Sequence, residues 1–62
     1  MEFNIKKIRI KMRITQYQMA EKLGISWRYL QQLEKGDRRP SWDTIESISK
    51  KLDISVHDLI DD

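Results

Sequence analysis

Signals that begin and end helices recur at short intervals along this chain, and they leave room only for short helices. Thr15 and Gln18 have the spacing of a capping box, in which the Thr hydroxyl accepts from a backbone N–H and the Gln side chain returns the contact. Gly24 can adopt the left-handed conformation that ends a helix. Ser26 is placed to begin the next helix, and Gly36 to end it.

The C-terminal third carries the same kind of signal. Ser41 is the predicted N-cap of a helix over residues 42–52, in which apolar side chains recur on one face. Ser55 and Asp58 have the spacing of a second capping box, before a short final helix. Because capping accounts for these hydroxyl groups, they do not call for a chemical role.

The N-terminal segment is ambiguous. In IRIKMRI, residues 8–14, apolar and basic residues alternate as in a half-buried strand, whereas positions 5, 8 and 12 have helical spacing. No segment of similar alternation follows, and a lone strand leaves its backbone groups unpaired. We therefore expect a helix with Asn4 as N-cap and Ile10 exposed, which makes the predicted fold class an all-α, compact five-helix bundle.

The composition excludes several kinds of protein. The 62 residues include no cysteine and one histidine, His57, so the usual metal-ligand sets and a histidine-assisted nucleophile are missing. Gly24 and Gly36 both fall at helix ends rather than in a phosphate-binding loop. No run of about 18 apolar residues and no apolar leader segment is present. We expect one cytoplasmic domain over residues 1–62, without catalytic activity, cofactor, metal, evident small-molecule ligand or membrane association.

The net charge of +2 conceals a division of the chain into a basic and an acidic part. Residues 1–40 hold ten Lys and Arg against four Asp and Glu, a balance of +6. Residues 41–62 hold two Lys against six Asp and Glu, a balance of −4. This asymmetry is compatible with a polyanion bound at one end, although charged solvated surfaces are common in small domains.

The two central helices have the features of a helix-turn-helix. Ala20 is a small residue where two helices could cross, Gly24 suits the turn, and Ile25, Leu30 and Leu33 can form the inner side. The second helix begins with polar and aromatic residues directed outward. In a helix-turn-helix this second helix enters the major groove of DNA, and its first residues meet the base edges.

The resemblance extends over most of the chain. The segment from residue 14 to residue 60 resembles the lambda Cro/repressor-like (XRE) helix-turn-helix family, and Ile5, Ile8 and Arg9 continue the pattern N-terminally. The positions that carry the family pattern are Thr15, Gln16, Met19, Ala20, Leu23, Gly24, Ile25, Ser26, Tyr29, Leu30, Leu33, Glu34, Gly36, Pro40 and Ser41. The resemblance implies a five-helix, helix-turn-helix domain and a sequence-specific regulator of transcription that binds double-stranded DNA, of bacterial, phage or mobile-element origin.

The resemblance also implies roles for individual residues. Arg28 is expected to contact guanine and Gln32 adenine, because these side chains can form two hydrogen bonds with the respective base edges. Arg9 and Glu34 resemble a structural ion pair that joins the first helix to the third. The base-reading positions are Trp27, Arg28, Gln31 and Gln32, and the phosphate-contacting positions are Gln16, Tyr29, Lys35, Arg38 and Arg39.

Two residues depart from the family pattern. Arg13 stands where the family usually has a glycine that ends the first helix, so this turn must form without the residue best suited to a left-handed conformation. Trp27 replaces a usually polar base-contacting residue. Its indole ring offers one donor and a large apolar face, suited to a thymine methyl group, a sugar or a protein partner.

Three readings follow for function. The leading one is a repressor that binds a two-fold operator as a homodimer, with residues 54–60 (Ile54, Val56, Leu59 and Ile60) as candidate dimer contacts. The second is a protein-interaction module on the same fold, an antitoxin or anti-repressor anchored by Trp27, Tyr29 and Trp42. The third is an accessory DNA-binding factor for recombination or excision.

Overall fold

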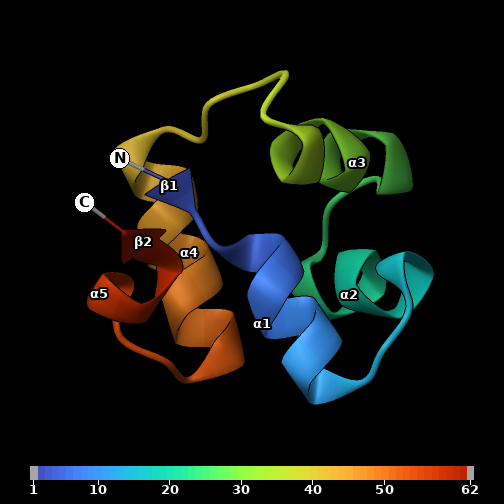
Figure 1. Ribbon diagram of the computed structural model, residues 1–62, viewed down its shortest axis with the longest axis horizontal. Coiled ribbons are helices and arrows are strands. Elements are labelled where there is room, and N and C mark those ends of the chain that lie inside the picture. Colours follow the sequence, from blue (N-terminus) through green and yellow to red (C-terminus); the bar gives the residue numbers. More distant parts are fainter. Residues whose placement is uncertain (1, 62) are drawn as a thin grey trace.

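The computed structural model describes residues 2–61, and its helices are those expected. The prediction of five short helices is confirmed over this range. The elements are β1 (Glu2–Phe3), α1 (Ile5–Met12), α2 (Gln16–Leu23), α3 (Trp27–Lys35), α4 (Trp42–Leu52), α5 (Val56–Leu59) and β2 (Ile60–Asp61), arranged as in Figure 1. None of the described helices is long and apolar enough to cross a membrane.

The predicted caps form the helix starts, with one exception. At α2 the capping box is complete, since Thr15 Oγ1 accepts from Gln18 N at 3.1 Å and Gln18 Oε1 accepts from Thr15 N at 2.8 Å. Ser26 Oγ accepts from Tyr29 N at 3.0 Å. Asn4 is the N-cap residue of α1, as expected, but its side chain forms no capping hydrogen bond. Its backbone N–H donates to the Leu59 carbonyl at 2.7 Å, and its φ and ψ of −90° and 21° lie outside the extended region of a side-chain cap.

Ser41 and Ser55 also accept hydrogen bonds at the starts of α4 and α5. Ser41 Oγ accepts from Thr44 N at 3.2 Å, and Ser55 Oγ from Asp58 N at 3.3 Å. The reciprocal contact of a complete box is found, within the described residues, only at α2. Hydroxyl groups at helix starts therefore have the structural role predicted for them.

The first four helices, α1 to α4, end at left-handed residues, and two of these residues are not glycine. Gly24 and Gly36 end α2 and α3 with φ of 69° and 83°. Arg13 ends α1 with φ of 59°, and Asp53 ends α4 with φ of 55°. The turn after α1 thus has the same backbone shape that a glycine would give it, at a steric cost that glycine would avoid.

A two-stranded antiparallel sheet joins the beginning and the end of the described chain. Phe3 pairs with Ile60, and Glu2 with Asp61, so β1 and β2 lie side by side next to α4 and α5 (Figure 1). This pairing was not predicted. Strands of two residues contain no detectable alternation, and their partner lies at the other end of the sequence.

All five helices contribute to one apolar core. Ala20 is buried on α2, and Leu59 is fully buried although α5 is only one turn long. Met12 is exposed rather than aligned with the inner residues of α1, and Ile10 is exposed as expected. The buried residues are Ile5, Met19, Ala20, Leu23, Leu30, Leu33, Ile45, Ile48 and Leu59.

Candidate nucleic-acid interface

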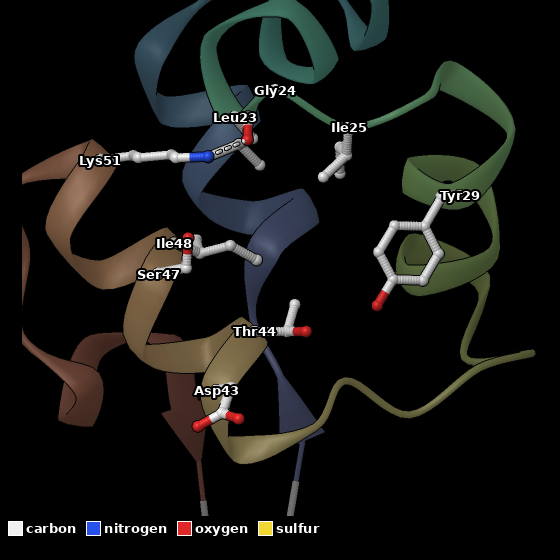
Figure 2. A pocket seen from close by; sticks show the side chains of 9 residues that line it. All are labelled: Leu23, Gly24, Ile25, Tyr29, Asp43, Thr44, Ser47, Ile48 and Lys51. Atoms are coloured by element: carbon white, nitrogen blue, oxygen red, sulfur yellow. Dashed lines mark hydrogen bonds between the residues drawn. The ribbon is translucent and has the colours of Figure 1, made fainter.

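The turn between α2 and α3 is short and firmly attached to α4. It consists of residues 24–26, and Ile25 packs partly buried against the core. Lys51 reaches from α4 and donates from Nζ to the carbonyl of Leu23 at 2.6 Å, beside Gly24 (Figure 2). This contact satisfies a carbonyl at the end of α2, where intrahelical donors run out. A side chain of α4 is therefore bonded to the end of α2, directly before the turn.

α3 has one face in the core and one face toward solvent. Leu30 and Leu33 are buried, whereas Arg28 is exposed and forms no side-chain hydrogen bond with another described residue. Gln31 and Gln32 are half-buried. The four predicted base-reading positions, Trp27, Arg28, Gln31 and Gln32, thus all lie in the first two turns of α3.

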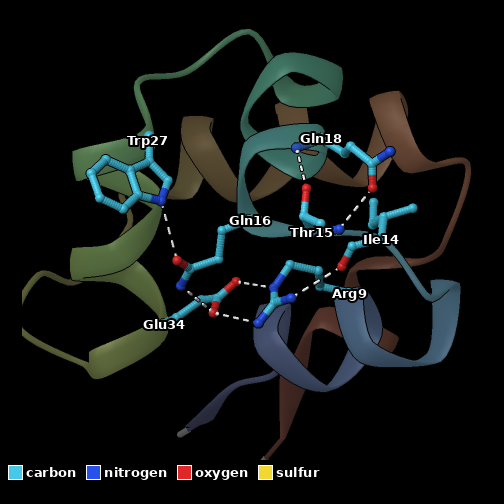
Figure 3. Close-up of polar contacts among 7 residues, drawn as sticks. All are labelled: Arg9, Ile14, Thr15, Gln16, Gln18, Trp27 and Glu34. Atoms are coloured by element: carbon cyan, nitrogen blue, oxygen red, sulfur yellow. Dashed lines mark hydrogen bonds and ion pairs between the residues drawn. The ribbon is translucent and has the colours of Figure 1, made fainter.

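A chain of hydrogen bonds links α1, α2 and α3 behind this surface (Figure 3). Arg9 donates through Nε to Glu34 Oε2 at 2.7 Å and through Nη2 to Glu34 Oε1 at 3.2 Å. Arg9 Nη1 also donates to the Ile14 carbonyl at 3.1 Å. Gln16 donates through Nε2 to Glu34 Oε1 at 3.0 Å, and its Oε1 accepts from Trp27 Nε1 at 3.2 Å. The structure therefore places Arg9 and Glu34 in a two-bond ion pair that also orients Gln16.

Burial makes this ion pair structurally important. The Glu34 side chain is 3% exposed and that of Arg9 is 15% exposed. A carboxylate removed from water to this extent must have its charge and lone pairs satisfied by the protein. Glu34 obtains three donors, two from Arg9 and one from Gln16. Loss of either partner would leave the other charged, largely buried and incompletely paired.

Trp27 is held against α2 by two contacts. Its indole N–H is bonded to Gln16, and its ring stacks on that of Tyr17, with centroids 4.8 Å apart and planes at 16°. Sequence reasoning did not single out Tyr17. The signal available was its position beside Gln16 at the start of α2, since the starts of the two helices lie close together in a helix-turn-helix.

Three of the predicted phosphate-contacting residues, Lys35, Arg38 and Arg39, line one hollow. Lys35, Arg38 and Arg39 are exposed at the end of α3 and in the following loop. Tyr29 is half-buried, and its ring extends from α3 toward α4 across a hollow of about 230 Å³ (Figure 2). The Arg38 guanidinium lies 5.7 Å from the centre of the Tyr29 ring, a cation–π distance.

The beginning of the basic loop is ordered by backbone contacts. The N–H groups of Asp37 and Arg38 donate to the Gln32 carbonyl at 3.0 and 3.3 Å. Arg38 is thereby fixed relative to α3.

Within residues 2–61, no cluster of three or more His, Cys, Asp or Glu side chains is arranged to hold a metal ion.

Comparison with known proteins agrees with this architecture. The helix-turn-helix family model matches residues 5–59, which is most of the chain. The chain belongs to the helix-turn-helix family. The residues matched by the family model run from the beginning of α1 to the end of α5, so β1 and β2 lie outside the match.

Curated relatives within the family are regulators by name. The chain is 40% identical over 57 residues to the uncharacterized HTH-type transcriptional regulator YqaE of Bacillus subtilis, covering 92% of this chain and 49% of that protein. It is 38% identical over 56 residues to the immunity repressor protein of Bacillus phage phi105, covering 90% of this chain and 39% of that protein. The chain therefore spans about half or less of the length of these relatives. No solved structure matches it.

Proposed function

We propose that the chain is a sequence-specific DNA-binding module of a transcriptional regulator, most simply a repressor. The observation that carries the proposal is the organisation of α3. Its inner face is in the core, its first turns present Arg28, Gln31 and Gln32, and Lys35 with Arg38 follows at its end. A helix with base-reading side chains at its start and cations beyond it suits the major groove.

Base recognition would rest on two long polar side chains. Arg28 is exposed and carries the donor pair that matches the O6 and N7 atoms of guanine. Gln32, one helical turn further on, has the donor and acceptor that match adenine. Each such contact is worth about 1–3 kcal/mol of discrimination against a wrong base. Gln31 lies on the flank and would adjust the preference of its neighbours.

Phosphate contacts would position α3 without reading the sequence. Lys35, Arg38 and Arg39 supply three exposed positive charges on one side of the molecule. Gln16 lies at the first position of α2, where free backbone N–H groups favour an anion. Tyr29 would contribute its hydroxyl group, with the ring held between α3 and Arg38.

A two-fold operator and a homodimer complete the proposal. α3 has nine residues, and a helix of that length can read only a few base pairs. Two copies on half-sites about 34–36 Å apart would provide a specific site. Leu59, considered above as a dimer contact, is fully buried in the core and is not available, while Ile54, Val56 and Ile60 are only partly buried.

The regulatory reading is supported by the relatives, one of which is a phage immunity repressor. In a bacterial cell the protein would act in the cytoplasm, associated with the nucleoid. Of the three anchors of the protein-interaction reading, Trp27 has its indole N–H bonded within the chain and Tyr29 is partly packed against the core, while Trp42 at the start of α4 is 58% exposed. We favour DNA binding because Arg28, Lys35, Arg38 and Arg39 are exposed as well, and phosphates would pair with these cations.

The deciding experiment is selection of bound duplexes from a random pool, followed by titration of the selected duplex at increasing salt. We expect a defined half-site and an affinity that falls steeply with salt, because bound cations are released from each neutralised phosphate. Arg28→Ala should relax the preference at one base position, whereas Arg38→Ala should lower affinity for all sequences alike. Undetectable or salt-independent duplex binding at about 50 mM salt would refute the proposal.

A further inference from the structure

Two stacked aromatic rings lie at the beginning of α2 and α3, on the side that the proposed function assigns to DNA. The Tyr17 and Trp27 rings are nearly parallel, with centroids 4.8 Å apart. Stacking would ordinarily accompany burial, yet Tyr17 is 63% exposed and Trp27 is 39% exposed. Trp27 is the first residue of α3, the position nearest to base edges when such a helix enters the groove.

The hydrogen-bonding capacity of Trp27 is already used. An indole ring has one donor and no acceptor. This donor is bonded to Gln16 Oε1, and the Gln16 amide nitrogen is bonded to Glu34, which Arg9 holds from α1. Exchange of this bond for one to a base would leave Gln16 Oε1 without its partner. What the ring still offers to an incoming molecule is its apolar surface.

The position of that surface is also fixed in advance. The hydrogen bond holds one edge of the indole, and the Tyr17 ring covers one face. A side chain with two such constraints has little rotamer freedom left to lose when it meets a ligand. Trp27 therefore forms part of a rigid apolar platform rather than a mobile side chain.

We propose that the Tyr17–Trp27 platform recognises the 5-methyl group of a thymine in the major groove. The inference rests on the proposed DNA-binding function and adds one element of specificity to it. Among the groups that base edges display in the major groove, the thymine methyl is the apolar one, and the others are donors or acceptors. A rigid ring without a free donor can distinguish bases there only by this group. Sugars are also apolar in part, but they are the same at every position and give no sequence preference.

Exposed cations along α3 and in the loop after it favour DNA over a protein partner for the surface that includes the platform. Arg28 follows Trp27 directly and is exposed, and Lys35, Arg38 and Arg39 lie further along the same segment. An apolar protein surface would have to desolvate these cations, whereas phosphates would pair with them. The platform is thus the apolar element of a surface whose charged elements suit a duplex.

The test replaces thymine by deoxyuridine, which removes the methyl group and leaves every hydrogen-bonding atom in place. The unmodified protein is titrated with its selected duplex and with duplexes that carry one such replacement at a time. We expect about a fourfold loss of affinity at one thymine per half-site, which corresponds to the ~0.8 kcal/mol of one buried methyl group. If that thymine is changed to cytosine, 5-methylcytosine should bind more tightly than cytosine by a similar factor, because it restores the methyl group.

Variants assign the effect to the platform. In Trp27→Gln the ratio of thymine to deoxyuridine affinities should fall to about one at that position, because the apolar surface is gone. In Tyr17→Ala the ratio should fall in part, because the indole loses its support. Tyr17→Phe is the matched control, since it keeps the stacked ring and should keep the ratio. Circular dichroism of each variant establishes that the helix content of the domain is unchanged.

The outcomes separate this inference from the proposed function. Selected duplexes that bind with the expected salt dependence, but tolerate deoxyuridine at every position, would overturn the methyl-recognition inference alone. If Trp27→Gln loses the same factor of affinity for thymine and deoxyuridine duplexes, the methyl-recognition inference is likewise overturned, and the ring contacts a sugar instead. Absence of a selected sequence, or of any duplex binding, would overturn both.

Discussion

Removal of the Glu34 carboxylate should destabilise this domain severely. Glu34 is 3% exposed and accepts three hydrogen bonds, two from Arg9 and one from Gln16. In Glu34→Ala the Arg9 guanidinium, itself only 15% exposed, keeps one described partner, the Ile14 carbonyl. The substitution therefore creates a largely buried charge without a counter-ion.

The expected loss is large relative to the total stability. Removing one partner of a buried pair costs about 3–5 kcal/mol. A chain of this length has a free energy of unfolding of about 3–9 kcal/mol, at the usual stability per residue. Because each kcal/mol moves the Tm of a domain of this size by about 4–8 °C, the Tm should fall by at least about 12 °C.

Thermal denaturation followed by circular dichroism at 222 nm measures this directly. Glu46→Ala, on the exposed side of α4, is the matched control and should change the Tm little. Glu34→Gln should lie between the two, because it keeps an acceptor oxygen but not the charge. A Glu34→Ala protein that melts within about 3 °C of the parent would show that the ion pair is not a major stabilising contact.

Three smaller predictions concern the helix ends. Arg13→Gly should raise the free energy of unfolding by about 0.5 kcal/mol in urea titrations, because glycine adopts the φ of 59° without the steric cost of a side chain. The greater entropy of glycine in the unfolded chain offsets part of this gain. A lower stability of the variant would contradict the prediction. Ser26→Ala should lower it by about 1 kcal/mol, because the Tyr29 N–H loses its cap, and Ser47→Ala in α4 serves as the control. Lys51→Met should lower the free energy of unfolding by about 1 kcal/mol, because the Leu23 carbonyl loses its hydrogen-bond donor. An unchanged urea midpoint would show that this bond contributes nothing.

Much of the fold could be predicted because the signals that begin and end its helices are local. Thr15 and Ser26 bond to N–H groups three residues away, and Gly24 and Gly36 end helices through their own backbone conformation. Such signals depend only on near neighbours in the sequence. Asn4 lies at the N-cap of α1 as expected, but its side chain forms no cap, and its N–H donates to the distant Leu59 carbonyl, a contact that near neighbours in the sequence do not reveal.

The candidate site also has a part that could be predicted from local sequence and a part that depends on contacts between helices. Positions on α3 follow from helical spacing and from the family resemblance, so the placement of Arg28 and Gln32 on its first turns could be anticipated. The stacking of Tyr17 on Trp27 could not, because it depends on the distance and angle between two helices. The same holds for Lys51, which reaches from α4 to the end of α2. Knowledge of these contacts changed the interpretation of Trp27 from a poor hydrogen-bonding residue to a rigid apolar surface.

The pairing of β1 with β2 has a consequence for how the domain can be attached to other polypeptides. Both ends of the described chain leave the molecule side by side, far from the beginning of α3 (Figure 1). A fusion partner or purification tag at either end would start from the same place, away from the beginning of α3 but close to the hollow that Phe3 and Ile60 line together with Lys35, Arg38 and Arg39. The two ends could also be joined by a short linker and the chain reopened between residues 37 and 40, since adjacent termini make circular permutation feasible. In such a permuted chain the new ends would lie in the loop after α3, so a segment added there would stand beside Arg38 and Arg39, which are proposed to contact phosphates.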